Sequence, residues 1–521
     1  MGMYLNLGND SFRAVRKGIY VDKSGLISFI NGTLGTMDKL TCVSRPRRFG
    51  KSFSAKMLCA YYDKSCDSKE LFADLKIAEA PSFEQYLNKY DVIYLDITWF
   101  ISNTPQKEDI VSNLQTKVME ELQGMYPQGA KEKTLPEMLA KISEITGNKF
   151  VVIIDEWDAL FREIKNDTKL QKEYIQLLRG LFKSSLTDKM IEAAYMTGIL
   201  PIKKYGTQSA MTDFREYTMI APKKLAEYMG FTELEVKALC QQYDMDFEEA
   251  KRWYDGYSFT KIKSVYSPNS VMEAIKNEEF GTYWTQTETY ESLRIYIDMD
   301  EDGLKEAIVQ MLGGAHIPID TGTFQNDMTS IRSRDDIFTL LIHLGYLAYC
   351  AKDKTVYIPN EEVRQEFVRA VKAGRYKEIV KMISASDKLL ENTLNGNQEE
   401  VAAALDVIHS KETAPLFYNN EQSLRYVIKF AYISCMDEFQ KIEEMPAGKG
   451  YADVVYLPKK GSSRPIMVVE LKWNKSAEGA IKQIKARKYP QSFEGFGNDI
   501  LLVGINYDEE SKKHTCVIER C

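Results

Sequence analysis

The tripeptide Gly50-Lys51-Ser52 has the residue types that hold a triphosphate. It ends the loop 44–52 (SRPRRFGKS), which follows the apolar run 40–43 and precedes a helix-like segment, 53–58. In a strand–loop–helix unit of this kind, backbone N–H groups and a helix N-terminus point toward an anion. Lys51 would reach the β- and γ-phosphates of ATP, and the Ser52 hydroxyl would ligate Mg²⁺. The spacing therefore predicts a nucleotide-binding P-loop.

One residue departs from the general pattern G-x-x-x-x-G-K-[ST], because Arg45 stands where the first glycine is expected. A basic loop before a helix is the alternative explanation of the segment taken alone. For a bound nucleotide, we expect contacts from the end of the loop and the start of the following helix: Arg47, Arg48, Phe49, Gly50, Lys51, Ser52 and Phe53.

An acidic pair, Asp155-Glu156, follows the continuous apolar run 150–154. Such a run is typical of a strand buried on both faces of a parallel sheet. Asp155 would hold Mg²⁺ beside Ser52, and Glu156 would polarise the water that attacks the γ-phosphate. The alternative is a surface acidic pair that caps the next helix.

Alternating strands and helices between residues 40 and 220 predict a doubly wound parallel sheet. Thr197 ends one of these strands, 193–196, and is our candidate contact for the γ-phosphate or the attacking water. A strand-end threonine with its hydrogen bond satisfied fits the pattern too. Ligands of such sheets bind at the carboxyl ends of the strands, where Lys51, Asp155 and Thr197 all fall.

A second group of charged residues lies near the C-terminus. Glu470 and Lys472 are two apart in the predicted strand 465–473, so they share one face of it and interrupt an otherwise apolar run. Burying them is costly unless that face is a site. Asp453, at the start of the partner strand, can lie beside them. The two carboxylates would hold Mg²⁺, and Lys472 would orient or activate the water that attacks a phosphodiester.

A surface hairpin with a Glu–Lys ion pair is the alternative for this group. The helix predicted over 477–489 follows the second strand and carries side chains available to a substrate backbone: Gln483, Lys485, Lys488 and Tyr489.

Length, charge and cysteine content limit the number of domains and the classes of function that the chain can have. The 521 residues suggest two to four domains, and the net charge of −7 means that any nucleic-acid contact must come from local patches. The eight cysteines form no C-x-x-C pair and only four histidines are present, which indicates a reducing cytosol and argues against a zinc site. No signal peptide or membrane-spanning run is recognised, so we expect a cytoplasmic protein.

Five segments together resemble a bacterial family that joins an AAA-ATPase-like domain to a C-terminal PD-(D/E)xK nuclease-superfamily domain. They are 20–23 (YVDK), 44–52, 154–158 (IDEWD), 253–257 (WYDGY) and 469–472 (VELK). The resemblance covers nearly the whole chain. An arginine in place of the first glycine, as at Arg45, looks typical of that family. The resemblance implies ATP and Mg²⁺ as cofactors. It also implies a nuclease site at Asp453, Glu470 and Lys472, with Gln483 and Tyr489 as the helix positions and looser matches at Glu421 and Glu444.

The chain departs from the family's Gly-Arg-x-Asp motif, because Tyr451 stands in the arginine position before Asp453. The missing arginine affects the expected contact with the substrate rather than the expected metal site. We expect an α/β P-loop domain over 1–220, a helical, winged-helix-like domain over 221–373, a helical connector over 374–412 and a restriction-endonuclease-like α/β domain over 413–521. His343, within the second of these, is expected to be a packed core histidine.

Three hypotheses follow. The first is an ATPase whose nucleotide state controls a metal-dependent nuclease acting on nucleic acid, DNA in preference to RNA. The second is a nucleotide-dependent switch whose C-terminal domain binds nucleic acid or a partner without cleavage. The third is a structural protein with two vestigial sites. An arginine finger could come from Arg162, Arg179 or Arg215, and a finger that acts in trans would require a homo-oligomer.

Overall fold

The computed structural model describes two compact units. The first comprises Met1–Thr289 and Ile317–Glu366, and the second comprises Tyr290–His316 and Phe367–Cys521. Each unit is described by itself. The described residues are 2–521 without 128–131, 203, 206–207, 210, 212, 285–289, 300–302, 326–330, 374–385, 387, 412–427, 429–430, 433–438, 448–449, 459–461, 463 and 487–498.

The first unit is built on a parallel sheet with the strand order β2-β3-β4-β1-β7. The strands are β1 (Leu40–Ser44), β2 (Asp91–Asp96), β3 (Phe150–Asp155), β4 (Ile191–Gly198) and β7 (Arg215–Tyr217). Every β3 residue is buried. The predicted parallel sheet is confirmed, and the strands predicted at 40–43, 150–154 and 193–196 are present.

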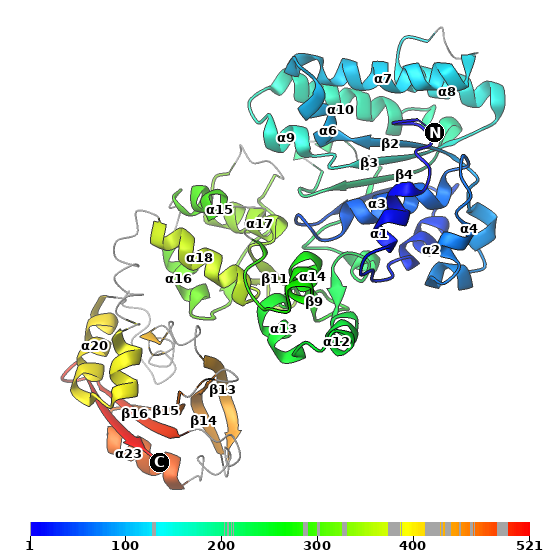
Figure 1. Cartoon of the computed structure of the whole chain (residues 1–521). Helices are drawn as coiled ribbons and strands as arrows, with labels where there is room; N and C mark the ends of the chain where they lie inside the picture. Colours follow the sequence, from blue (N-terminus) through cyan, green and yellow to red (C-terminus); the bar gives the residue numbers. More distant parts are fainter. Residues whose placement is uncertain are drawn as a thin grey trace. The chain divides into compact units, whose positions relative to one another are not determined.

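Helices cover both faces of this sheet (Figure 1). Alternate β3 residues belong to different cores: Val152 and Ile154 pack with one layer of helices, and Val151 and Ile153 with the other. The first layer holds α6 (Ile97–Asn103), α7 (Ile110–Met125), α8 (Leu135–Thr146), α9 (Ala159–Glu163) and α10 (Thr168–Phe182). The second holds α1 (Asp10–Arg16), α2 (Gly25–Asn31), α3 (Lys51–Tyr62), α4 (Lys69–Phe72) and α5 (Phe83–Tyr86).

Shorter elements complete the first unit. Connections within the sheet domain contain α11 (Thr187–Met190), β5 (Lys204–Tyr205), β6 (Gln208–Ser209) and the 3₁₀ turns η1 (Lys76–Glu79), η2 (Lys107–Asp109) and η4 (Lys223–Leu225). A helical region follows, with β8 (Phe231–Thr232), α12 (Glu233–Gln242), α13 (Phe247–Tyr254), β9 (Val265–Tyr266) and α14 (Pro268–Asn277). Its last part contains β10 (Ile317–Pro318), α17 (Arg334–Leu344), β11 (Ala348–Cys350), β12 (Thr355–Tyr357) and the start of α18 (Glu361–Ala373).

The predicted helix and hairpin at 337–358 are present as α17, β11 and β12, with β10 as a third antiparallel strand. His343 is buried, as expected for a packed histidine. The winged-helix assignment and the domain boundaries at 220, 373 and 412 stay predictions.

The second unit contains α15 (Tyr290–Ile297), α16 (Leu304–Leu312), α20 (Gln398–Lys411) and a mixed five-stranded sheet of order β13-β14-β15-β16-β17. The strands are β13 (Phe439–Ala447), β14 (Gly450–Pro458), β15 (Ile466–Trp473), β16 (Ile500–Asp508) and β17 (Lys513–Arg520). Only β15 and β16 are parallel, and α23 (Ala477–Ala486) connects them. This mixed sheet with its crossover helix agrees with the predicted α/β C-terminal domain.

None of the helices in the described part of the chain is long and apolar enough to cross a membrane. Three of our assignments lie outside the described residues: Lys488, Tyr489 and Glu421. Glu444 lies in β13.

Candidate nucleotide and nuclease sites

The P-loop turns sharply into α3, which begins at Lys51. Arg48 and Gly50 both have positive φ angles, 62° and 90°. Glycine suits the second position because a side chain is strained in this backbone region. The turn presents the N-terminus of a twelve-residue helix at the carboxyl end of β1, which is the arrangement that binds phosphate.

Arg45 is fully buried beneath this loop. Its Nη1 donates to the carbonyl oxygens of Ser44 (2.8 Å) and Tyr217 (3.0 Å), and its guanidinium lies 5.5 Å from the centre of the Phe259 ring. Burial lowers the pKa of Arg45 to about 10. The residue that replaces the first glycine therefore ties the loop to β7 and to the segment after α13.

Lys51 is 3% exposed, and its Nζ donates to the carbonyl oxygens of Arg45 (3.1 Å) and Pro46 (2.9 Å). The same Nζ lies 3.4 Å from Oε1 of Glu156. An ammonium group has three donors, and these three partners can use all of them. Phosphate oxygens entering the loop must therefore displace a protein partner of Lys51.

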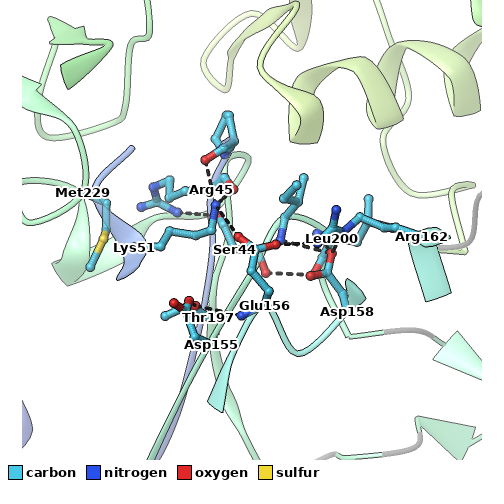
Figure 2. A network of polar contacts seen from close by, with 12 residues as sticks. Ser44, Arg45, Lys51, Asp155, Glu156, Asp158, Arg162, Thr197, Leu200 and Met229 are labelled. Atoms are coloured by element: carbon cyan, nitrogen blue, oxygen red, sulfur yellow. Dashed lines mark hydrogen bonds and ion pairs between the residues drawn. The ribbon is translucent and has the colours of Figure 1, made fainter. Parts of the chain in front are cut away.

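The ends of the neighbouring strands β3 and β4 bring Asp155 and Thr197 together (Figure 2). The Thr197 hydroxyl donates to Oδ1 of Asp155, and the Tyr94 hydroxyl lies 3.2 Å from Oδ2. Thr197 also accepts a hydrogen bond from the Glu156 amide at 3.3 Å. The predicted magnesium ligand, Asp155, and the predicted γ-phosphate contact, Thr197, thus touch each other at the edge of the sheet where ligands bind.

Glu156 bridges two cations, since its Oε2 accepts from Nη2 of Arg162 while its Oε1 faces Lys51. Burial raises the pKa of Glu156, but the charges of Lys51, Arg162 and Arg47 outweigh burial and hold the pKa below its ordinary value. Its backbone is in the left-handed region, with φ of 52°. Such conformations cost about 1–3 kcal/mol and cluster at functional sites.

Asp158 completes this network and was not assigned from the sequence. Its Oδ2 accepts from Nε of Arg162 (3.0 Å) and from the amides of Ile199 (3.1 Å) and Leu200 (2.7 Å). The available signal was the i, i+4 spacing of an aspartate and an arginine on a predicted helix, which allows an ion pair. Arg162 is buried here, whereas the other finger candidates, Arg179 and Arg215, are exposed.

The remaining predicted nucleotide contacts point in different directions. Phe49 is buried against the rings of Tyr257 and Trp284, and Arg48 donates to Oδ1 of Asn269 at 3.1 Å. Both side chains contact the helical region that follows the sheet. Three further residues are accessible to solvent to different degrees: Arg47 is exposed, Ser52 is half-buried on the first turn of α3, and Phe53 is 55% exposed.

The C-terminal sheet brings Asp453, Glu470 and Lys472 to one face. The pairing of Val454 with Val469 sets Asp453 beside Glu470, and Oδ2 of Asp453 accepts from the Leu471 amide at 2.9 Å. All three charged side chains are less than a tenth exposed. The same face carries the apolar core shared with α23.

Glu470 is held by two donors. Its Oε1 accepts from Nζ of Lys472 at 3.1 Å and from Nε2 of Gln483 on α23. The part of the chain that the structure describes contains no cluster of three or more His, Cys, Asp or Glu side chains that could hold a metal. Mg²⁺, however, is commonly bound by one or two carboxylates together with water and substrate phosphates. Asp453 and Glu470 fit that donor set.

Two family models match the sequence. The model described as predicted AAA-ATPase matches residues 6–207, and that of the PD-(D/E)XK nuclease superfamily matches residues 395–516. The chain joins a predicted AAA-ATPase region to a PD-(D/E)XK nuclease superfamily domain. Lys51, Asp155, Glu156 and Thr197 lie in the AAA-ATPase region, and Asp453, Glu470, Lys472 and Gln483 lie in the nuclease-superfamily domain.

Two solved structures are distant neighbours. The Aeropyrum pernix ORC2 protein, in ADPNP–ADP complexes, is 11% identical with a TM-score of 0.31, and covers 68% of this chain and 96% of its own. A DNA replication initiation factor is 10% identical with a TM-score of 0.23, and covers 81% of this chain and 97% of its own. Scores this low carry no argument about function. No curated protein matches the sequence.

Proposed function

We propose that the AAA-ATPase region binds and hydrolyses ATP with Mg²⁺, and that its nucleotide state controls Mg²⁺-dependent cleavage of nucleic acid, DNA in preference to RNA, by the nuclease-superfamily domain. The convergence of Lys51, Asp155, Glu156 and Thr197 at adjacent strand ends supports this proposal most directly. The described cysteines are free thiols, which fits a cytoplasmic protein.

In this proposal, Lys51 binds the phosphates with the amides at the start of α3, and Ser52 and Asp155 hold Mg²⁺. When bound there, Mg²⁺ would neutralise part of the negative charge of the triphosphate. Thr197 keeps Asp155 oriented through its hydroxyl. Glu156 accepts a proton from the attacking water once its carboxylate turns from Lys51 to the substrate.

In the nuclease-superfamily domain, Asp453 and Glu470 would hold Mg²⁺, and the ion would supply Lewis acidity for attack on a phosphodiester. Lys472 orients the attacking water, since its ammonium lies on the same face as both carboxylates. The Gln483 amide fixes the orientation of Glu470. The proposal thus gives a role to Asp453, Glu470, Lys472 and Gln483, and it assigns none to Glu444.

A paired assay tests both sites. ATP hydrolysis and cleavage of DNA and RNA are measured with Mg²⁺ on wild type, Lys51→Ala and Glu470→Ala. Lys51→Ala is expected to lower hydrolysis at least about 100-fold and to change the cleavage rate. Glu470→Ala is expected to abolish cleavage and leave hydrolysis near wild type. Two exposed residues provide matched controls, Lys169→Ala and Glu478→Ala.

A second candidate function is nucleotide-controlled binding of nucleic acid or a partner without cleavage. Tyr451, which stands where the nuclease motif has arginine, favours this alternative. Cleavage by wild type that disappears in Asp453→Ala would exclude it. Intact DNA and RNA after incubation with ATP and Mg²⁺ or Mn²⁺, combined with retained ATP hydrolysis, would favour it over the first proposal.

A further inference from the structure

Four charged side chains, three of them buried and Glu156 half-buried, form one network between the P-loop and α9. Glu156 lies between Lys51 and Arg162, and Arg162 lies between Glu156 and Asp158 (Figure 2). The charges of these two cations and two anions cancel. Because interactions between buried charges are only weakly screened, removal of one member changes the forces on its neighbours.

Arg162 is held by carboxylates from two sides. Its Nε and Nη2 bind two different carboxylates, Asp158 and Glu156, and its side chain is 7% exposed. Asp158 is itself held by the amides of Ile199 and Leu200, which follow β4. The guanidinium is therefore anchored to the sheet through Asp158, and the Glu156 carboxylate is drawn toward that fixed point.

Lys51 is the member that a nucleotide must recruit. Its Nζ binds two P-loop carbonyl oxygens and faces Glu156 at 3.4 Å, a longer separation than in the Glu156–Arg162 pair. A carboxylate that bound Lys51 alone would compete with the triphosphate for this ammonium and would repel the phosphates. When Arg162 neutralises the carboxylate, both the competition for Lys51 and the repulsion of the phosphates become weaker.

We propose that Arg162 is a positioning residue that acts through Glu156: it holds and neutralises this carboxylate so that Lys51 stays available to the phosphates of a nucleoside triphosphate. The inference rests on the proposed nucleotide binding and assigns the arginine a role within its own chain. We do not assign it as an arginine finger for a neighbouring copy, because its Nε and Nη2 already bind carboxylates of its own chain.

The test is a double-mutant cycle read by binding rather than by hydrolysis. A fluorescent, non-hydrolysable ATP analogue is titrated with Mg²⁺ into wild type, Arg162→Gln, Glu156→Gln and the double variant. Arg162→Gln is expected to weaken binding about tenfold, because it leaves Glu156 to Lys51. In the Glu156→Gln background the same change is expected to alter the dissociation constant less than about twofold, since the carboxylate is gone.

Two controls keep the cycle interpretable. Lys169→Gln removes an exposed cation from α10 and is expected to leave the dissociation constant unchanged. Arg162→Gln leaves Asp158 without its cation, and thermal unfolding monitors whether the variant folds. If it does not fold, Arg162→Gln is combined with Asp158→Asn, which removes the two charges together. That pair is then tested with and without Glu156→Gln, with the same expected dependence on Glu156.

The inference is overturned if Arg162→Gln weakens binding equally in both backgrounds, which would indicate direct contact with the nucleotide or a general structural role. It is also overturned if Arg162→Gln has no effect in either background. Recovery of ATP hydrolysis on mixing Arg162→Gln with Lys51→Ala would overturn it in favour of a finger acting in trans. If wild type does not bind the analogue, the proposed nucleotide binding itself fails. If wild type binds but Arg162→Gln has the same effect with and without Glu156, only the role assigned to Arg162 fails.

Discussion

Gly198 ends β4 one residue after Thr197, and an alanine at this position would crowd the nucleotide site. A Cβ built there lies 2.7 Å from Oδ1 of Asp158 and 2.7 Å from both Cδ1 and Nε1 of Trp157. Ordinary van der Waals contact begins at 3.4 Å. The φ angle of Gly198 is not positive, so Gly198→Ala tests packing without adding backbone strain.

The magnitude follows from what must move. Asp158 cannot shift without weakening its bonds to the Ile199 and Leu200 amides, and hydrogen bonds to a charged group contribute about 1.5–3 kcal/mol each. Trp157 is 1% exposed and packed against Phe161. Overpacking of this kind costs about 1–3 kcal/mol. Because both neighbours are held, we expect Gly198→Ala to lower the free energy of unfolding of the first unit by about 2–3 kcal/mol.

The assay is urea unfolding of the full chain followed by circular dichroism, with the transition of the first unit compared between variants. Gly124→Ala in α7 is the matched control, because nothing lies within 4 Å of its added Cβ. The same substitution in an open helical position is expected to stabilise by up to about 1 kcal/mol. A midpoint for Gly198→Ala at or above that of wild type, or an equal fall in both variants, would refute the reasoning.

Three further predictions address charged and polar groups elsewhere. Burial lowers the pKa of His343 to about 3, so the unfolded chain binds this proton first. The free energy of unfolding should fall by up to about 1.4 kcal/mol per pH unit below about pH 6.5. Urea unfolding at pH 7 and pH 5 should show a smaller difference between the two pH values for His343→Leu than for wild type. Gln483→Leu removes a hydrogen-bond donor to Glu470. The Mg²⁺ concentration for half-maximal cleavage should therefore rise about 10- to 100-fold. An unchanged Mg²⁺ requirement would show that Gln483 does not orient Glu470 for metal binding. Lys23→Met removes a largely buried ion pair with Glu235 (2.6 Å), and should lower the free energy of unfolding by about 3 kcal/mol, measured against exposed Lys169→Met.

The sequence alone determined the elements that carry the chemistry. Apolar runs ending in Asp155 and Thr197 are readable because a buried parallel strand is apolar on both faces. The Gly50-Lys51-Ser52 turn is recognisable because a phosphate-binding loop needs a glycine for its tight backbone turn and a lysine for its positive charge. In the C-terminal domain, the two-residue period of a strand is enough to place Glu470 and Lys472 on one face. Such signals are local, so residue order is sufficient to show them.

Only the tertiary structure decided which distant side chains meet. The burial of Arg45 against the Tyr217 carbonyl joins positions far apart in the chain, and no local pattern distinguishes it from a loop arginine that faces solvent. Phe49 and Arg48 were predicted as nucleotide contacts, yet their side chains pack on the region after the sheet. Whether a loop side chain turns inward depends on the surface folded against it, which periodicity does not encode.

The same distinction separates the partners of the P-loop lysine. The sequence provided Lys51 and Glu156 as reacting groups, and it left Arg162 as one of three equivalent finger candidates. The fold makes Arg162 the partner of Glu156 rather than a free finger, because the turn after β3 places it beside both Glu156 and Asp158, whereas Arg179 and Arg215 are exposed. Residue types determine what chemistry a chain can perform, and the distances set by packing decide which charges act on one another.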